Sequence, residues 1–354
     1  METILVLVHN DSDGALPKSA CEAIGAGARL AADAGISGFS VGVIGCGVQP
    51  SLDALALCGA TRFLAVDHAE LGQSRYATDA AAAEAMARAA GASIVLAPMT
   101  SRWARVLPGV THRLGGRVDT HATGLAVADG EIGVTRWFYR QRMEATLNRT
   151  ERPWVILLDQ GACPTWSGAA GRVTAEQVVV EFPGALMRTT VTGIEAPPAE
   201  QQTIRPDADL LFVTGAGWTK KQSDGQVHVA QAEQIILDFL KRSRASLGSS
   251  KSLVDLSGEG QAVLPFMTHL NQVGQTGSTP RHPKGLATCC HGEEPHVVGW
   301  RFITERRAVN LDPNCGWARG KADVLYVADA FAVMTKVNEL LLATTPPGSA
   351  RTPF

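Results

Sequence analysis

Glycines and short polar side chains are grouped at three places in the second half of the chain, each directly after an apolar run. The first group is Thr214–Gly217, the second is Val273–Gly277 and the third is Cys289–His296. Glycine lets backbone N–H groups approach a ligand closely, and amides, hydroxyls and imidazoles add hydrogen-bonding groups. In α/β proteins such loops bind nucleotides at the carboxyl ends of strands. The pattern predicts a nucleotide-type cofactor, although each group alone is also compatible with an ordinary polar turn.

Other kinds of site fit these segments poorly. Thr214–Gly217 lacks the third glycine of a dinucleotide fingerprint and the lysine spacing of a Walker motif. Within Cys289–His296, Pro295 interrupts the helical spacing that a His-Glu-x-x-His zinc site requires, so no metal ligand is predicted. No Ser-His-Asp, Cys-His or paired-acid arrangement indicates a substrate site, so no catalytic residue is predicted either.

Composition and charge limit the class of protein. The 354 residues suffice for two domains, and the 45% hydrophobic content can fill a core in each. A net charge of −2 gives little reason to expect nucleic acid or a membrane as a partner. Seven cysteines, an odd number, favour a reducing cytoplasm. The apolar run Ile4–Val8 is too short for a signal peptide or a membrane span and predicts a buried strand.

Two basic segments invite other interpretations. The strip Arg136–Arg142 interleaves arginines with aromatic residues, as nucleic-acid surfaces do. We favour an antiparallel strand that lines a cofactor cleft or a partner interface. Lys220 and Lys221 are predicted to be ordinary solvated residues. No nucleic-acid partner is therefore expected.

The first hundred residues alternate short β-branched runs with alanine-rich helical stretches, which predicts a doubly wound parallel sheet. From about residue 120 to residue 180 the pattern changes to alternating strands with an Asp129-Gly130 turn, which predicts an antiparallel extension. The expected strands are Ile4–Val8, Phe39–Ile44, Arg62–Val66, Ser93–Ala97, Thr123–Val127, Gly133–Phe138 and Trp154–Leu158, and the expected helices are Lys18–Asp33, Ser51–Ala60 and Tyr76–Ala90.

A second, smaller doubly wound α/β domain is expected over residues 207–343, after a first domain at 1–195. Residues 196–206 lack apolar periodicity and predict a linker, and residues 344–354 predict a tail. The expected strands of the second domain are Leu210–Thr214, Ser252–Asp255, Leu286–Cys290, Arg307–Asn310 and Val324–Val327, and its expected helices are near His228–Leu247 and at Ala330–Leu342.

Four motifs in this second domain together resemble the FAD-binding C-terminal domain of the electron transfer flavoprotein α subunit. That family has Val-Gly-Gln-Thr-Gly, then Ser-Gly-Ala-Ile-Gln-His, then Asn-x-Asp-Pro, then Val-Ala-Asp before the last helix. This chain has Val273–Gly277, His291–His296, Asn310–Pro313 and Val327–Asp329 in the same order. The joint match is far more specific than any single motif. The domain order is similar too, since the family's N-terminal α/β domain packs on a partner subunit and its C-terminal domain holds FAD.

The resemblance implies roles for individual residues. Thr276 would meet flavin N5, Gln275 and neighbouring backbone would hold the ring and the ribityl chain, and His296 would meet the ring's O2. Asn310 and Asp329 would bind the adenosine end. Ser250 and Lys251 would lie near the pyrophosphate and the flavin, and Lys251 and His296 would supply positive charge to the ring. The full set of FAD contacts implied is Gly217, Ser250, Lys251, Val273, Gly274, Gln275, Thr276, Gly277, His291, Gly292, His296, Asn310 and Asp329.

The chain departs from the family pattern at several of these positions. The family's Gly-Gly-Arg-Gly after the first strand is Gly215–Trp218 here, so its arginine is absent. Lys251 stands for a second arginine and keeps the charge without the planar fork. His291 replaces a serine and Pro295 replaces a glutamine.

The function implied is that of an electron transfer flavoprotein α-type subunit, an electron carrier without an organic substrate of its own. It would pair with a β-type subunit, which often holds AMP, and pass electrons from a flavoprotein dehydrogenase to a quinone-linked or iron–sulfur acceptor. The altered arginine, serine and glutamine positions leave an alternative, a structural or regulatory nucleotide-binding subunit of a larger redox assembly. A nicotinamide-dependent oxidoreductase ranks last because no Gly-x-Gly-x-x-Gly unit follows a strand.

Overall fold

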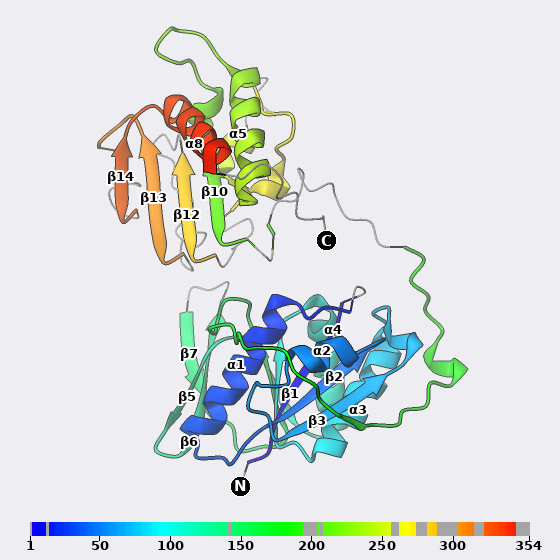
Figure 1. The fold of residues 1–354 in the computed structure, drawn as a ribbon. Helices are drawn as coiled ribbons and strands as arrows, with labels where there is room; N and C mark the ends of the chain where they lie inside the picture. The colour runs from blue at the N-terminus through cyan, green and yellow to red at the C-terminus, as the bar shows by residue number, and fades with distance from the viewer. Residues whose placement is uncertain are drawn as a thin grey trace. The chain divides into compact units, whose positions relative to one another are not determined.

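The computed structural model describes residues 2–11, 14–139, 143–193, 204–205, 208–255, 262–273, 282–288, 303–314 and 322–344. The chain divides into two compact units, Met1–Ile194 and Glu195–Phe354 (Figure 1). Each unit has its own sheet, so the predicted α/β fold class is confirmed. Most of the predicted linker and residues 345–354 of the predicted tail lie outside the described residues, and Thr344 still belongs to the last helix.

The first unit contains a nine-stranded sheet in the order β7-β6-β5-β8-β4-β1-β2-β3-β9. The six strands from β8 to β9 in this order pair in parallel, as does β5 with β8, whereas β5, β6 and β7 pair antiparallel. The bounds are β1 (Ile4–His9), β2 (Ser40–Gly45), β3 (Arg62–Asp67), β4 (Ile94–Pro98), β5 (Arg117–Ala128), β6 (Glu131–Phe138), β7 (Met143–Leu147), β8 (Trp154–Leu158) and β9 (Glu176–Gln177).

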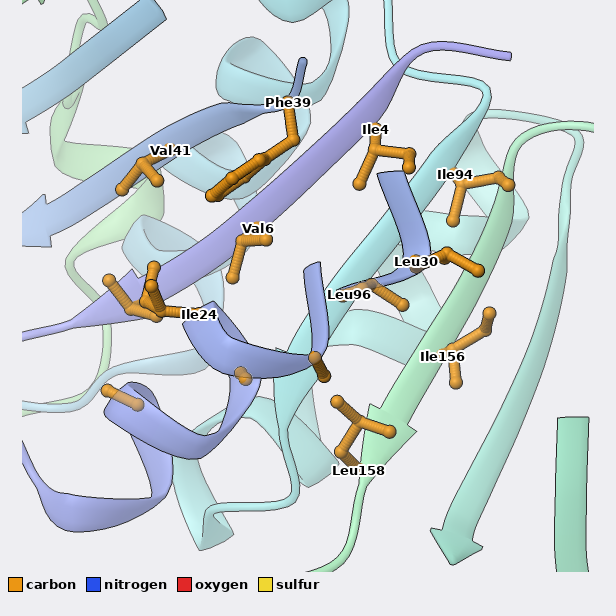
Figure 2. Packing of buried hydrophobic residues seen from close by; sticks show 14 of the residues in the cluster. Ile4, Val6, Ile24, Leu30, Phe39, Val41, Ile94, Leu96, Ile156 and Leu158 are labelled. Atoms are coloured by element: carbon orange, nitrogen blue, oxygen red, sulfur yellow. The ribbon is translucent and has the colours of Figure 1, made fainter. Parts of the chain in front are cut away.

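Helices cover both faces of this sheet because its central strands are apolar on both sides. Ile4 and Val6 of β1 pack against Ile24 and Leu30 of a helix on one face (Figure 2). The alternate residue Leu5 points to the opposite face and joins a second cluster, with Met86 and Trp103 of two other helices. The helices are α1 (Lys18–Asp33), α2 (Gln49–Ala54), α3 (Tyr76–Ala90) and α4 (Ser101–Arg113).

The expected antiparallel extension is partly wrong. Trp154–Leu158 was assigned to it, but β8 lies between β4 and β5 and pairs in parallel with both. All five residues of β8 are buried, as in the interior of a parallel sheet, because both of its faces are covered. Helix α4 was not predicted. Thr100 caps its N-terminus, because Oγ1 of this residue accepts the N–H of Trp103 at 3.2 Å, and the helix contains Pro108.

The second unit contains a smaller parallel sheet of five strands in the order β11-β10-β12-β13-β14. Its helices α5 (Val229–Ser243) and α8 (Ala330–Thr344) pack on one face, where Phe212 of β10 meets Ile236 of α5 and Met334 of α8. The strands are β10 (Leu210–Thr214), β11 (Ser246–Ser249), β12 (Lys284–Thr288), β13 (Glu305–Asn310) and β14 (Val324–Val327). In chain order this is 2-1-3-4-5, a doubly wound arrangement that reverses between β10 and β12.

Two expectations for this unit are wrong. The helix expected over His228–Leu247 ends at Ser243, because Arg244 adopts a left-handed φ of 54° and terminates it. The strand expected at Ser252–Asp255 is instead part of the short helix α6 (Lys251–Asp255), and the strand is β11. Short apolar runs do not distinguish a strand from one helical turn, and the pairing of β11 with β10 decides between them.

Candidate functional site

The carboxyl ends of β10, β13 and β14 surround a pocket of about 310 Å³ in the second unit. This volume is at the small end of the range of about 300–1,000 Å³ that ligand pockets occupy. The carboxyl edge is also where open parallel sheets bind their ligands. The pocket is lined by Gly217, Lys221, Gln222 and Ser223 after β10, by Val309, Asn310 and Leu311 at the end of β13, and by Ala328, Asp329, Ala330 and Phe331 between β14 and α8.

Three of the predicted cofactor contacts, Gly217, Asn310 and Asp329, line this one pocket. Asn310 is only 3% exposed, and its Oδ1 accepts the N–H of Asp312 at 3.2 Å. The Oδ1 of Asp329 accepts the N–H of Ala332 at 2.9 Å, which satisfies a free donor in the first turn of α8. Local backbone bonds therefore fix both polar side chains at the pocket.

Ser250, Lys251 and Val273 form a second group at the same edge of the sheet, after β11, and do not line the pocket. Ser250 is buried, and its N–H donates to the carbonyl of Thr214 at 2.9 Å. The N–H of Val273 donates to the carbonyl of Ser249 at 3.1 Å. Lys251 is exposed, and its Nζ lies 3.8 Å from Asp255 Oδ2.

The remaining predicted contacts lie outside the described residues. They are Gly274, Gln275, Thr276, Gly277, His291, Gly292 and His296. Their roles stay predictions.

One buried hydroxyl beside the second group suits a polar ligand. Ser249 at the end of β11 is fully buried, and its Oγ has no hydrogen-bond partner within the described ranges. Such an atom costs about 1–3 kcal/mol unless a polar group reaches it. Ser249 also pairs with Gln272, directly before Val273. The carboxyl edge thus offers an orphaned donor on one side and a polar pocket on the other, which fits an extended nucleotide.

Sequence analysis missed three residues that build the pocket. Trp218 is fully buried, donates its Nε1–H to Thr288 Oγ1 at 2.9 Å and packs on Phe331 with ring centroids 4.6 Å apart. It therefore joins the ends of β10 and β12 to the start of α8. Lys221 and Gln222 line the pocket, and Lys221 is exposed, in agreement with its prediction as a solvated residue. Gly217 stands where the resemblance expects an arginine, so the pair of lysines in the following turn was the available signal.

The first unit also places polar side chains at the carboxyl ends of its strands. His9, the last residue of β1, is buried, its Nε2 lies 3.1 Å from Thr100 Oγ1, and burial lowers the pKa of the imidazole. His121 Nδ1 lies 3.1 Å from Asp159 Oδ1. Of the basic strip, Arg136 is in β6 and donates to Asp119 at 3.0 Å, whereas residues 140–142 lie outside the described part.

The described part of the chain contains no cluster of His, Cys, Asp and Glu that could hold a metal ion. It also contains no helix with the length and apolar character to cross a bilayer.

A family model for the electron transfer flavoprotein domain matches residues 4–183, just over half of the chain, from β1 to beyond β9. No curated protein matches the sequence.

Proposed function

Because this chain belongs to the electron transfer flavoprotein family, we propose that it is an α-type subunit that binds FAD at the carboxyl edge of its second sheet. The observation that supports this most is the convergence of Gly217, Asn310 and Asp329 on one pocket, from three separate elements. The three residues lie far apart in the sequence, and their meeting at one pocket supports both the residue assignments and the cofactor.

FAD, when bound, supplies reversible electron storage, which is the chemistry that side chains cannot provide. The residues of the chain bind and orient it. The Asn310 carboxamide can both donate to and accept from an adenosine group, and the Asp329 carboxylate can accept a bond from a ribose hydroxyl. Ser250 and the unpartnered Ser249 Oγ offer hydrogen bonds on the other side of the edge.

Two basic residues, Lys251 and His296, are proposed to stabilise negative charge on the flavin ring. In this proposal the cationic side chain of Lys251 lies near the isoalloxazine ring with His296, where a cation stabilises added electron density. Thr276 and Gln275 hold the ring, with Val273, Gly274, Gly277, His291 and Gly292 around them.

The same proposal assigns partners. A β-type subunit, in which AMP is possible, pairs with the first unit, a flavoprotein dehydrogenase donates electrons, and a quinone-linked or iron–sulfur protein accepts them. The compartment is the cytoplasm. In this proposal the chain itself turns over no organic substrate.

The test is the visible absorbance of the chain co-purified with a β-type subunit. A complex without a flavin band contradicts the proposal. A complex that holds FAD or AMP but accepts no electrons from any flavoprotein dehydrogenase supports the structural or regulatory alternative instead.

Two matched variants test the pocket itself. Asp323 and Asp329 lie just before and just after β14, at opposite edges of the sheet. Asp329→Asn keeps an acceptor for the N–H of Ala332 but removes the charge, and we expect it to weaken FAD binding by about tenfold, equivalent to about 1.4 kcal/mol. Asp323→Asn, which loses only an exposed ion pair with Arg306, is the control and should retain full flavin occupancy. Equal occupancy in the two variants would rule out the pocket as the adenosine site.

A further inference from the structure

The turn that follows β10 is held together by its own hydrogen bonds. The N–H of Gln222 donates to the carbonyl of Gln226 at 2.8 Å, and the N–H of Gly225 donates to the carbonyl of Gln222 at 2.9 Å. Asp224 Oδ1 accepts the N–H of Gln226, and its Oδ2 lies 2.7 Å from His228 Nε2. The backbone from residue 220 to residue 228 is therefore a defined turn with its acidic group already paired.

Gln222 fastens this turn to the pocket. Its Nε2 donates to the carbonyl of Gly217 at 3.0 Å and to the carbonyl of Lys220 at 2.7 Å. Lys221 lies between these anchored residues and lines the pocket, whereas its neighbour Lys220 does not. The hydrogen bonds of Gln222 thus fix the turn so that Lys221, and not the adjacent Lys220, lines the pocket.

Lys221 and Asp329 are the two charged residues that line the pocket. Asp329 is bonded to the first turn of α8, at Ala332. Lys221 makes no ion pair with any residue that the structure describes. The 15-residue helix α8 also begins at this pocket, with Ala330 and Phe331 among the lining residues, and a helix N-terminus attracts anions. A lysine without an ion-pair partner among the described residues and the N-terminus of α8 therefore lie at the same pocket.

Gly217 has no side chain, so the positive charge that the resemblance expects at this position must come from elsewhere. We propose that Lys221 supplies it and binds the phosphate groups of the cofactor, with Gln222 as the residue that positions it. This inference rests on the proposed function, because it assigns the phosphate contact of the same site. A lysine binds phosphate as a compact point charge without the bidentate geometry of arginine.

The experiment compares Lys221→Gln with Lys220→Gln, which removes the same charge one residue away. The full chain with its β-type subunit is stripped of flavin and titrated with FAD, followed by flavin fluorescence, and with ADP and adenosine, followed by calorimetry. We expect Lys221→Gln to weaken FAD and ADP binding by about tenfold or more, the loss of one charge-assisted hydrogen bond. Adenosine, which has no phosphate, should bind equally to both variants.

Further variants and titrations decide the outcome. Lys221→Arg should restore ADP affinity, and the salt dependence of FAD binding should be shallower in Lys221→Gln than in Lys220→Gln because one charge is gone. Equal ADP affinity in the two glutamine variants, or an equal loss for adenosine, would overturn the assignment of Lys221. A wild-type complex that binds ADP but no FAD would reject the proposed function while the ADP and adenosine titrations still test Lys221. A complex that binds neither rejects both.

Discussion

Asp119 of β5 is a buried carboxylate that accepts hydrogen bonds from two arginines and a tryptophan. It is fully buried and accepts hydrogen bonds from Arg149 Nε at 2.6 Å, Arg136 Nη1 at 3.0 Å and Trp154 Nε1 at 2.9 Å. Burial by itself raises the pKa of Asp119, but the bonds from Arg149, Trp154 and Arg136 outweigh it and hold the pKa below its ordinary value of 3.8. One side chain thus joins β6 and β8 across β5.

Replacement of Asp119 by Asn should destabilise the first unit by about 3 kcal/mol, because it leaves two arginines without their counter-charge. The folded-state pKa is lowered, so the contribution of the carboxylate is fully present above its ordinary pKa of 3.8 and is lost as the pH falls through the folded value. Urea unfolding between pH 7 and pH 3 measures it. Asp129→Asn, in the exposed turn after β5, is the control. A deficit that stays constant or grows toward pH 3 would contradict this account.

The sequence can predict which residues lie at the carboxyl ends of parallel strands. Gly217, Asn310 and Asp329 follow apolar runs directly, and parallel strands bring their carboxyl ends to one edge, so their convergence was predictable. Lys221 was not, because Gln222 places it through hydrogen bonds that no spacing indicates. The bonds of Asp119 were missed for the same reason, since Arg149 is 30 positions away along the chain.

At the scale of elements, α1 lies close to β1 because a glycine faces the strand. A Cβ built on Gly27 of α1 would overlap Cγ2 of Val6, a fully buried β-branched residue that cannot move aside. A Cβ on Gly109 of α4 would instead meet the hydroxyl of Tyr76, which is 41% exposed and can turn away. The two glycines therefore have different packing roles in otherwise comparable helices.

Gly27→Ala and Gly109→Ala should accordingly have opposite effects. Both gain about 1 kcal/mol of helix propensity. In Gly27→Ala that gain is opposed by overpacking, so this variant should be less stable than Gly109→Ala by about 1–3 kcal/mol. Thermal unfolding of the two variants beside the wild type checks the prediction. Equal stability would show that α1 can shift away from β1.

Local sequence signals predicted the exact bounds of some helices and missed another helix entirely. The bounds of α1 and α3 were correct because alanine-rich composition fills each helix, and Gly91 ends α3 with a left-handed φ of 58°. Helix α4 was missed because Pro108 and its polar residues hide the pattern. The direction of β8 was wrong because its neighbours decide it, and Trp154–Leu158 would look the same in either pairing.

At the scale of the whole molecule, the first unit carries the evidence for the family and the second unit carries the candidate cofactor site. The family match covers residues 4–183, within the first unit, while the pocket and the predicted cofactor residues belong to the second. The hydrophobic clusters of the described residues follow the same division, since each is confined to one unit. Because the cores are separate, a substitution or a bound ligand in one unit is expected to change the stability of that unit alone.

Separate cores lead to a prediction for unfolding of the full chain. Calorimetry should show two transitions, and FAD should raise the temperature of only one, because a ligand stabilises the unit that binds it by about 2.7 kcal/mol at 100 times Kd. Asp119→Asn should lower the temperature of the other transition, which identifies it as the first unit, and Asp329→Asn should reduce the shift that FAD causes without moving either transition in its absence. If FAD instead raised both transitions equally, or if Asp119→Asn moved the transition that responds to FAD, the cofactor would bind across both units or in the first, and the assignment of the site to the edge of the second sheet would fail.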